Sequence, residues 1–139
     1  MTRQAIIVAG GRGTRMNNEV PKQFLPLCGK PIVMHTLETF YKFDPHIEII
    51  LVLPEHLIVY WQNLCVEHHF DIPHHIVAGG QERFYSVKKG LAFAKPNALI
   101  AIHDGVRPFV SHSTLERCFS LAELQGNAIP AMPLVDSIR

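Results

Sequence analysis

The stretch QAIIV (residues 4–8), followed directly by AGGRGTRM (residues 9–16), decides the fold. The first part is a short apolar run, typical of a buried β-strand. The second part places three glycines within residues 10–13. Because glycine lets successive backbone N–H groups turn toward one point, this loop favours an anion site suited to phosphate. A strand that ends in such a loop predicts a ligand at its carboxyl end.

Beyond this loop, short apolar runs alternate with segments of helical periodicity. Apolar residues recur at helical spacing over 32–41, 57–68, 84–94 and 115–122, and further strands are expected at 47–53, 75–77, 99–102 and 128–135. The runs at 47–53 and 99–102 are typical of buried strands in a parallel sheet. The order predicts an α/β fold: an open, mostly parallel sheet with helices on both faces and functional loops after Val8, Val77 and Ile102.

Local signals also predict the ends of the last helix. Ser113 and Glu116 have the spacing of a capping box, which is typical of a helix start. Gly126 is suited to end the same helix, because glycine adopts the left-handed backbone found after helix C-termini.

Composition narrows the class of protein. The 139 residues, 47% of them hydrophobic, are enough for one globular domain. A net charge of +1 lacks the basic field of nucleic-acid-binding proteins, so we expect no nucleic-acid partner. No apolar run has the length of a signal peptide or a membrane span, and we therefore expect a cytoplasmic protein without membrane contact. Three cysteines without C-x-x-C spacing predict neither disulfides nor a zinc ribbon, and Cys65 and Cys118 are expected in the core.

Cations gather around the glycine-rich loop. Arg12, Arg15 and Lys22 lie within eleven residues, a pattern that suits a polyphosphate, although a solvated loop charge is the alternative for any single lysine. Dinucleotide binding is disfavoured, because Met16 occupies the position where that fingerprint needs a small residue. The Gly-Lys-Ser/Thr ending of a Walker loop is also missing.

Two later loops carry further candidates. Gly79 and Gly80 precede a helix and permit close approach of a flat base, which Ser86 could contact through a hydrogen bond. Asp104 follows a predicted strand and is placed to hold a Mg²⁺ ion that bridges phosphates. Arg107, in the same loop, is placed to bind an anionic substrate.

The paired histidines are not expected to bind a metal, and their role stays open. The pairs 68–69 and 74–75 match no zinc-ligand spacing and lie away from the predicted binding edge. His103 is expected to pack or to orient a neighbour rather than to act as a general base.

Five segments together resemble one enzyme family. They are AGGRGTRM (9–16), PKQFLPLCGKPIVMHTLETF (21–40), GGQERFYSVKKGL (79–91), HDGVRPF (103–109) and AIPAMPLVDSIR (128–139). Their order resembles that of 2-C-methyl-D-erythritol 4-phosphate cytidylyltransferases of the non-mevalonate isoprenoid pathway. The resemblance implies a Rossmann-like nucleotidyltransferase fold that uses Mg²⁺ to join CTP to methylerythritol 4-phosphate, a polyol phosphate, with release of pyrophosphate.

The resemblance also implies roles for particular residues. Ala9, Gly10, Gly11 and Gly13 would bind the nucleotide, Gly80 and Ser86 would contact cytosine, Arg15 and Lys22 would be catalytic, and Asp104, Arg107 and Ser137 would contact the acceptor substrate. Asp104 would also support Mg²⁺. Position 137 is usually threonine in the family, and the serine found here keeps the hydroxyl group.

Members of this family continue well beyond residue 139, through an arm exchanged between subunits. We therefore expect residues 1–139 to form an incomplete nucleotidyltransferase domain, truncated at the C-terminus, and the full-length form to be a homodimer. Two alternatives stay open. Ribitol 5-phosphate cytidylyltransferases share the glycine loop, the Pro-Lys-Gln-Phe-Leu segment and a similar HD-x-V-R-P-F stretch. A non-catalytic CTP-binding module would bind the nucleotide without turnover.

Overall fold

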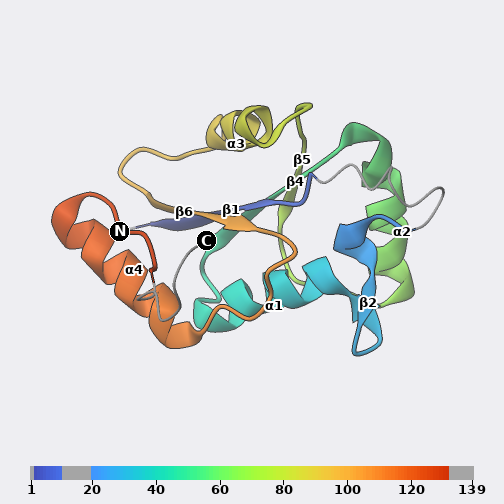
Figure 1. Ribbon diagram of the computed structural model, residues 1–139, viewed down its shortest axis with the longest axis horizontal. Helices are drawn as coiled ribbons and strands as arrows, with labels where there is room; N and C mark the ends of the chain where they lie inside the picture. Colours follow the sequence, from blue (N-terminus) through green and yellow to red (C-terminus); the bar gives the residue numbers. More distant parts are fainter. Residues whose placement is uncertain (1, 11–19, 132–139) are drawn as a thin grey trace, which may run out of the picture.

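A parallel sheet organises the computed structural model, which describes residues 2–10 and 20–131 (Figure 1). Its strands are β1 (Arg3–Val8), β4 (Glu48–Leu53), β5 (His75–Ala78) and β6 (Leu99–Asp104), in the spatial order β5-β4-β1-β6. All pairings are parallel, and Ile6 of β1 lies opposite both Ile50 and Ile102. The loops after β1, β5 and β6 therefore leave the same edge of the sheet, as predicted.

Helices cover both faces of this sheet, as the α/β prediction required. The helices are α1 (Ile32–Phe43), α2 (Ile58–Glu67), α3 (Arg83–Leu91) and α4 (His112–Gln125), with short 3-10 turns η2 (Lys22–Phe24) and η3 (Glu55–Leu57) and a small hairpin of β2 (Pro26–Leu27) and β3 (Lys30–Pro31). In Figure 1, α3 lies on one face, whereas α1 and α4 lie on the other.

The two central strands supply the core on both faces. Ile7 and Leu51 pack on the side of α1, while Ile6 and Ile50 pack on the side of α3, and all four are fully buried. Since side chains alternate between the faces of a strand, burial on both sides explains why these runs are almost wholly apolar.

Strand β6 differs from its prediction. We expected residues 99–102 to be buried, but they are only partly covered, and Ile102 is 44% exposed. The reason is position: within the described residues β6 pairs with β1 alone and forms an edge of the sheet. Residues 128–131 of the expected last strand are irregular, and residues 132–135 lie outside the described residues.

Helix α3 packs on the sheet through Val87 and small residues rather than through its largest apolar side chains. Phe84 and Leu91 are 68% and 41% exposed, whereas Ser86 and Gly90 are buried. A Cβ atom on Gly90 would lie 2.7 Å from Cγ2 of Ile6. Of the apolar stripe expected over 84–94, Val87 packs against the core beside Ile6 and Ile50, whereas Phe84 and Leu91 do not, because close approach to the sheet requires small side chains.

The start of α4 is also corrected. Ser111, not Ser113, caps the helix, and its Oγ accepts a hydrogen bond from the N–H of Thr114 at 3.1 Å. The expected capping box of Ser113 and Glu116 is therefore wrong, because both residues lie within the helix. The end of the helix was predicted correctly, since Gly126 follows it in the left-handed conformation with φ of 96°.

The expectation that Cys65 and Cys118 lie in the core is confirmed only in part. Cys65 and Cys118 are half-buried on α2 and α4, Cys65 against the main core, and all three thiols are free. Burial raises the pKa of the Cys65 thiol to about 11, which keeps it protonated and unreactive at neutral pH.

His74 anchors the connection between α2 and β5. The indole N–H of the buried Trp61 donates to Nε2 of His74 at 3.0 Å, and Nδ1 of His74 donates to the carbonyl oxygen of Ile72 at 2.8 Å. This arrangement requires the neutral imidazole. Burial lowers the pKa of His74, and the nearby His75 lowers it further, while the hydrogen bond to Ile72 acts in the opposite direction.

We expect mild acid to destabilise the protein through His74. Below the ordinary imidazole pKa of 6.5, the unfolded chain takes up a proton that the folded His74 resists, so the free energy of unfolding falls as pH falls. Urea unfolding followed by the fluorescence of the single tryptophan, between about pH 7.5 and about pH 5, measures this slope. His74→Gln, which keeps a donor and an acceptor but does not titrate, should show a shallower slope. Equal slopes would contradict the assignment.

Candidate functional site

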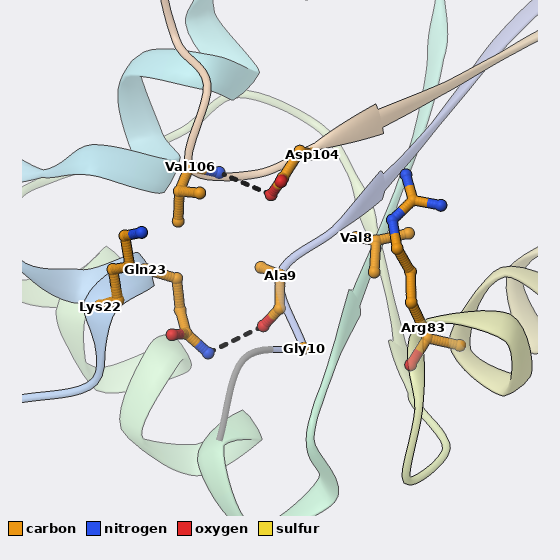
Figure 2. Close-up of a pocket in the computed structure, with 9 residues that line it drawn as sticks. Val8, Ala9, Gly10, Lys22, Gln23, Arg83, Asp104 and Val106 are labelled. Carbon is orange, nitrogen blue, oxygen red and sulfur yellow. Dashed lines mark hydrogen bonds between the residues drawn. The ribbon is translucent and has the colours of Figure 1, made fainter. Parts of the chain in front are cut away.

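A pocket of about 370 Å³ opens at the carboxyl ends of β1 and β6 (Figure 2). Among the described residues it is lined by Val8, Ala9, Gly10, Lys22, Gln23, Arg83, Ser86, Asp104 and Val106. These residues come from the end of β1, the η2 turn, the first turns of α3 and the end of β6 with its loop. The fold thus brings together segments that are up to a hundred residues apart in the sequence, at the edge where parallel α/β sheets bind ligands.

The loops around the pocket begin as extensions of the sheet. The N–H of Ala9 donates to the carbonyl oxygen of Val52 at 2.9 Å, and the N–H of Gly105 donates to that of Val8 at 2.8 Å. Both loops therefore start from a fixed backbone, which suits a site that must hold a ligand without first reorganising.

The η2 turn holds the exposed cation Lys22 next to two buried residues, Gln23 and Phe24. Gln23 is 1% exposed, and its Nε2 donates to the carbonyl oxygen of Ala9 at 2.8 Å, while Phe24 stacks near Trp61 at 6.0 Å between ring centroids. The neighbouring Lys22 is itself exposed and lines the pocket. Sequence reasoning assigned a role to Lys22 and missed Gln23, whose position next to Lys22 was the available signal.

Ser86 lies between two of the loops. It is 1% exposed, and its Oγ accepts a hydrogen bond from the N–H of Gly80 at 3.2 Å. A Cβ atom would lie 3.4 Å from this oxygen if added at Gly10, and 2.6 Å if added at Gly79. At Gly80 an added Cβ would lie only 2.2 Å from Cβ of Tyr85. Glycine is therefore required sterically after β5, and Gly80 lines an adjoining hollow that shares Gly10 with the pocket.

The loop after β6 separates its two candidate residues. The carboxylate of Asp104 lines the pocket, and its Oδ1 accepts from the N–H of Val106 at 3.3 Å. Arg107 does not line the pocket: its side chain is 76% exposed, with Nε 3.6 Å from Oδ2 of Asp104. His103 has the orienting role expected for it, since Nε2 donates to the carbonyl oxygen of Arg107 at 2.8 Å and the ring packs edge-on against Phe40.

Arg83 is a pocket residue that sequence reasoning did not assign. It opens α3 directly after the Gly-Gly loop, and that position was the signal that could have indicated it. In the view of Figure 2, Arg83 and Lys22 lie on opposite sides of Ala9 and Gly10. Five other residues singled out in the sequence lie outside the described residues: Gly11, Arg12, Gly13, Arg15 and Ser137.

The acidic groups of the site are few. Among the described residues that line the pocket, Asp104 is the acidic one, and no cluster of three or more metal-ligating side chains occurs in the described part of the chain. A single carboxylate suits a cation that also binds substrate phosphates, as Mg²⁺ commonly does. The arrangement can therefore hold an anionic ligand between cations, with one oxygen ligand at its edge.

Comparison with known proteins identifies the family. The family model described as 2-C-methyl-D-erythritol 4-phosphate cytidylyltransferase matches residues 4–139. The chain belongs to the 2-C-methyl-D-erythritol 4-phosphate cytidylyltransferase family. Among curated members, the enzyme of Bacteroides fragilis is 52% identical over 139 residues, which are 100% of this chain and 64% of that protein. The enzyme of Porphyromonas gingivalis is 50% identical over 138 residues, which are 99% of this chain and 61% of that protein.

Solved structures support this cytidylyltransferase family assignment. The 4-diphosphocytidyl-2C-methyl-D-erythritol synthase of Anaerococcus prevotii is 28% identical, with a TM-score of 0.69 over 86% of this chain and 50% of that chain. The bifunctional IspDF of Campylobacter jejuni is 25% identical, with a TM-score of 0.72 over 91% of this chain and 31% of that chain. The Rossmann-like nucleotidyltransferase fold expected from the sequence is thus confirmed.

Two further observations concern the length of the chain relative to its relatives and the character of its helices. The chain spans 64% of the length of the Bacteroides cytidylyltransferases that it matches. None of the helices in the described ranges combines the length and the apolar character needed to cross a membrane.

Proposed function

We propose that this protein transfers the cytidylyl group of CTP to 2-C-methyl-D-erythritol 4-phosphate, giving the CDP-methylerythritol product and pyrophosphate in non-mevalonate isoprenoid biosynthesis. The observation that carries the proposal is the pocket itself. In a chain of this family, it gathers the predicted cation Lys22, the carboxylate of Asp104 and the hydroxyl of Ser86 around the backbone of Ala9 and Gly10.

The nucleotide half of the site would use backbone and hydroxyl groups. Ala9 and Gly10, with Gly11 and Gly13 completing the loop, would bind the phosphates and the base edge. Gly80 and Ser86 would contact cytosine, since the Ser86 hydroxyl can both donate and accept a hydrogen bond. Cytosine presents donors and acceptors on one edge, so these groups match it.

The reaction would be a direct in-line displacement. An oxygen of the acceptor phosphate, already ionised at neutral pH, attacks the α-phosphorus of CTP, and a new O–P bond forms. The bond between the α-phosphorus and the bridging oxygen breaks, and its electron pair leaves with pyrophosphate. No strong general base is needed, so catalysis rests on positioning and on cations that meet the developing charge. Lys22 and Arg15 would supply this charge at the α-phosphate, and Arg83 would add a cation on the other side of Ala9 and Gly10 in the view of Figure 2.

Asp104 fits the Mg²⁺ ion that the family resemblance implies. Its carboxylate supplies the hard oxygen ligand that Mg²⁺ prefers, at the edge of the pocket. When bound, the ion neutralises phosphate charge. Arg107 and Ser137 would contact the methylerythritol phosphate, with Arg107 adjusting from its exposed position beside Asp104.

Pyrophosphate release tests the proposed reaction. The longest natural form of the protein is incubated with CTP, Mg²⁺ and methylerythritol 4-phosphate, in parallel with ribitol 5-phosphate. Release with the first acceptor alone is expected. Release with ribitol 5-phosphate alone would assign the protein to that other activity, and CTP binding without release from either acceptor would indicate a non-catalytic module.

We expect Gly80→Ala to weaken CTP binding by about tenfold or more. The added Cβ would lie 2.2 Å from Cβ of Tyr85, so the start of α3 must move and carry Ser86 with it. Isothermal titration with CTP measures the change. Gly29→Asn is the matched control, because Gly29 has open space around it, lies in the β2–β3 hairpin and has a positive φ that asparagine tolerates. Equal affinity of Gly80→Ala and wild type would contradict the proposed nucleotide site.

We also propose that the natural protein is a cytoplasmic homodimer, on the strength of the family resemblance. Sedimentation equilibrium at concentrations where pyrophosphate release is measured tests the assembly. A monomer mass in an active sample would contradict it.

A further inference from the structure

A buried hydroxyl of α1 contacts the loop that follows β6, although 69 residues separate the two in the sequence. Thr36 is fully buried, and its Oγ1 donates to the carbonyl oxygen of Gly105 at 2.7 Å. The N–H of the same glycine donates to the carbonyl oxygen of Val8 at 2.8 Å. The backbone at Gly105 is therefore held from two sides, by α1 and by the end of β1.

Gly105 has little room to move toward the first loop. A Cβ atom added there would lie 2.9 Å from Cβ of Ala9 and 3.3 Å from the carbonyl oxygen of Val8. Asp104 directly precedes this glycine, and Figure 2 shows it beside Val106 above Ala9 at the pocket. Any shift of the Gly105 backbone therefore changes where the Asp104 carboxylate lies.

A second threonine of α1, Thr39, also contacts this loop, but its hydroxyl has two competing acceptors. Thr39 Oγ1 lies 2.9 Å from the carbonyl oxygen of Pro108 and 3.0 Å from that of His35, one turn back in its own helix. A hydroxyl has one hydrogen, so Thr39 divides it between helix and loop. Thr36 directs its hydrogen to the loop.

We propose that Thr36 is a positioning residue: through Gly105, its hydroxyl holds the loop in the orientation that presents Asp104 to the pocket. This inference rests on the proposed function for its kinetic readout. Thr36→Val keeps the shape of the side chain and removes the donor, which leaves a buried carbonyl free to turn toward water. Because small misplacements of reacting groups are costly, kcat/KM for methylerythritol 4-phosphate should fall by about 10–100-fold. CTP affinity measured without Mg²⁺ should change by less than about twofold, since the proposed nucleotide contacts lie on other loops.

Two matched variants separate positioning from loss of stability. Thr36→Ser keeps the hydroxyl and should restore kcat/KM to within about threefold of wild type. Phe43→Leu perturbs the other end of α1, where Phe43 stacks on Phe119, and should lower the unfolding midpoint while keeping kcat/KM. The proposal is overturned if Thr36→Val keeps full activity, if serine does not rescue, or if Phe43→Leu loses activity to the same extent.

A structural readout keeps this inference independent of the proposed reaction. If the wild type releases no pyrophosphate with either acceptor, the proposed function fails, and hydrogen exchange then decides the role of Thr36. The N–H of Val106 donates to Oδ1 of Asp104, and the N–H of Arg107 donates to its carbonyl oxygen at 3.1 Å. These two amides should exchange faster in Thr36→Val than in Thr36→Ser. Equal protection in both variants would overturn the inference.

Discussion

Replacing Lys22 with alanine is expected to lower turnover by about 10²–10³-fold while leaving the fold intact. Lys22 is exposed and lines the pocket, and within the described residues no carboxylate forms an ion pair with it. Its charge is therefore available to an anionic ligand. Removal of one such group in a preorganised site takes away stabilisation that matters most as charge develops on the α-phosphate. Steady-state pyrophosphate release at saturating CTP and acceptor measures the effect.

Lys30→Ala is the matched control for this experiment. Lys30 lies on β3, close to Lys22 in the sequence, but it pairs with Glu38 of α1 and does not line the pocket. A partly exposed ion pair contributes little to stability, so this variant should keep its turnover and its unfolding midpoint. Near-normal turnover of Lys22→Ala, or an equal loss in both variants, would refute the catalytic role of Lys22.

Replacing Trp61 with alanine is expected to lower the free energy of unfolding by about 3–5 kcal/mol. Trp61 is fully buried, packs near Phe24 and Phe70, and donates its indole N–H to His74. Its removal leaves a cavity and takes away the hydrogen-bond donor of His74 Nε2. Since domains of this size are stable by about 5–15 kcal/mol, the loss is a large share of the total. Urea unfolding followed by circular dichroism measures it, because the variant has no tryptophan.

The adjacent Tyr60 supplies the control. Its ring stacks on Phe24 at 5.2 Å from the outside and is 42% exposed, so Tyr60→Ala should cost about 1 kcal/mol. If Trp61→Ala does not fold, Trp61→Phe keeps part of the packing and should show an intermediate loss. Because Phe24 packs near Trp61 and follows Lys22 and Gln23 in the η2 turn, turnover of Trp61→Ala should also fall. A loss of stability no larger in Trp61→Ala than in Tyr60→Ala would contradict the role assigned to Trp61.

The candidate site was predictable from the sequence where a short segment by itself indicates a ligand-binding residue. Glycines after a strand, a lysine in a short rigid segment and an aspartate after a strand are visible in the sequence, and Gly10, Lys22 and Asp104 do line one pocket. Ser86 was singled out as a hydrogen-bonding residue from its place at a helix start, and its hydroxyl accepts a hydrogen bond from the N–H of Gly80. Arg107 shows the limit of such reasoning, because proximity to Asp104 in sequence did not place its side chain in the pocket.

The sequence by itself determined the order of strands and helices and the edge at which the loops gather. The spacing of apolar residues indicates whether one face or both faces of a segment are buried, and this spacing is a local property of the sequence. Tertiary structure decided what periodicity does not encode: β6 pairs on one side only within the described residues, and α3 faces the sheet with Ser86 and Gly90. It also decided that Gln23 and Thr36 donate to the backbones of two site loops. Such contacts join segments far apart in the chain, so they depend on how the packed elements meet rather than on the residues beside them.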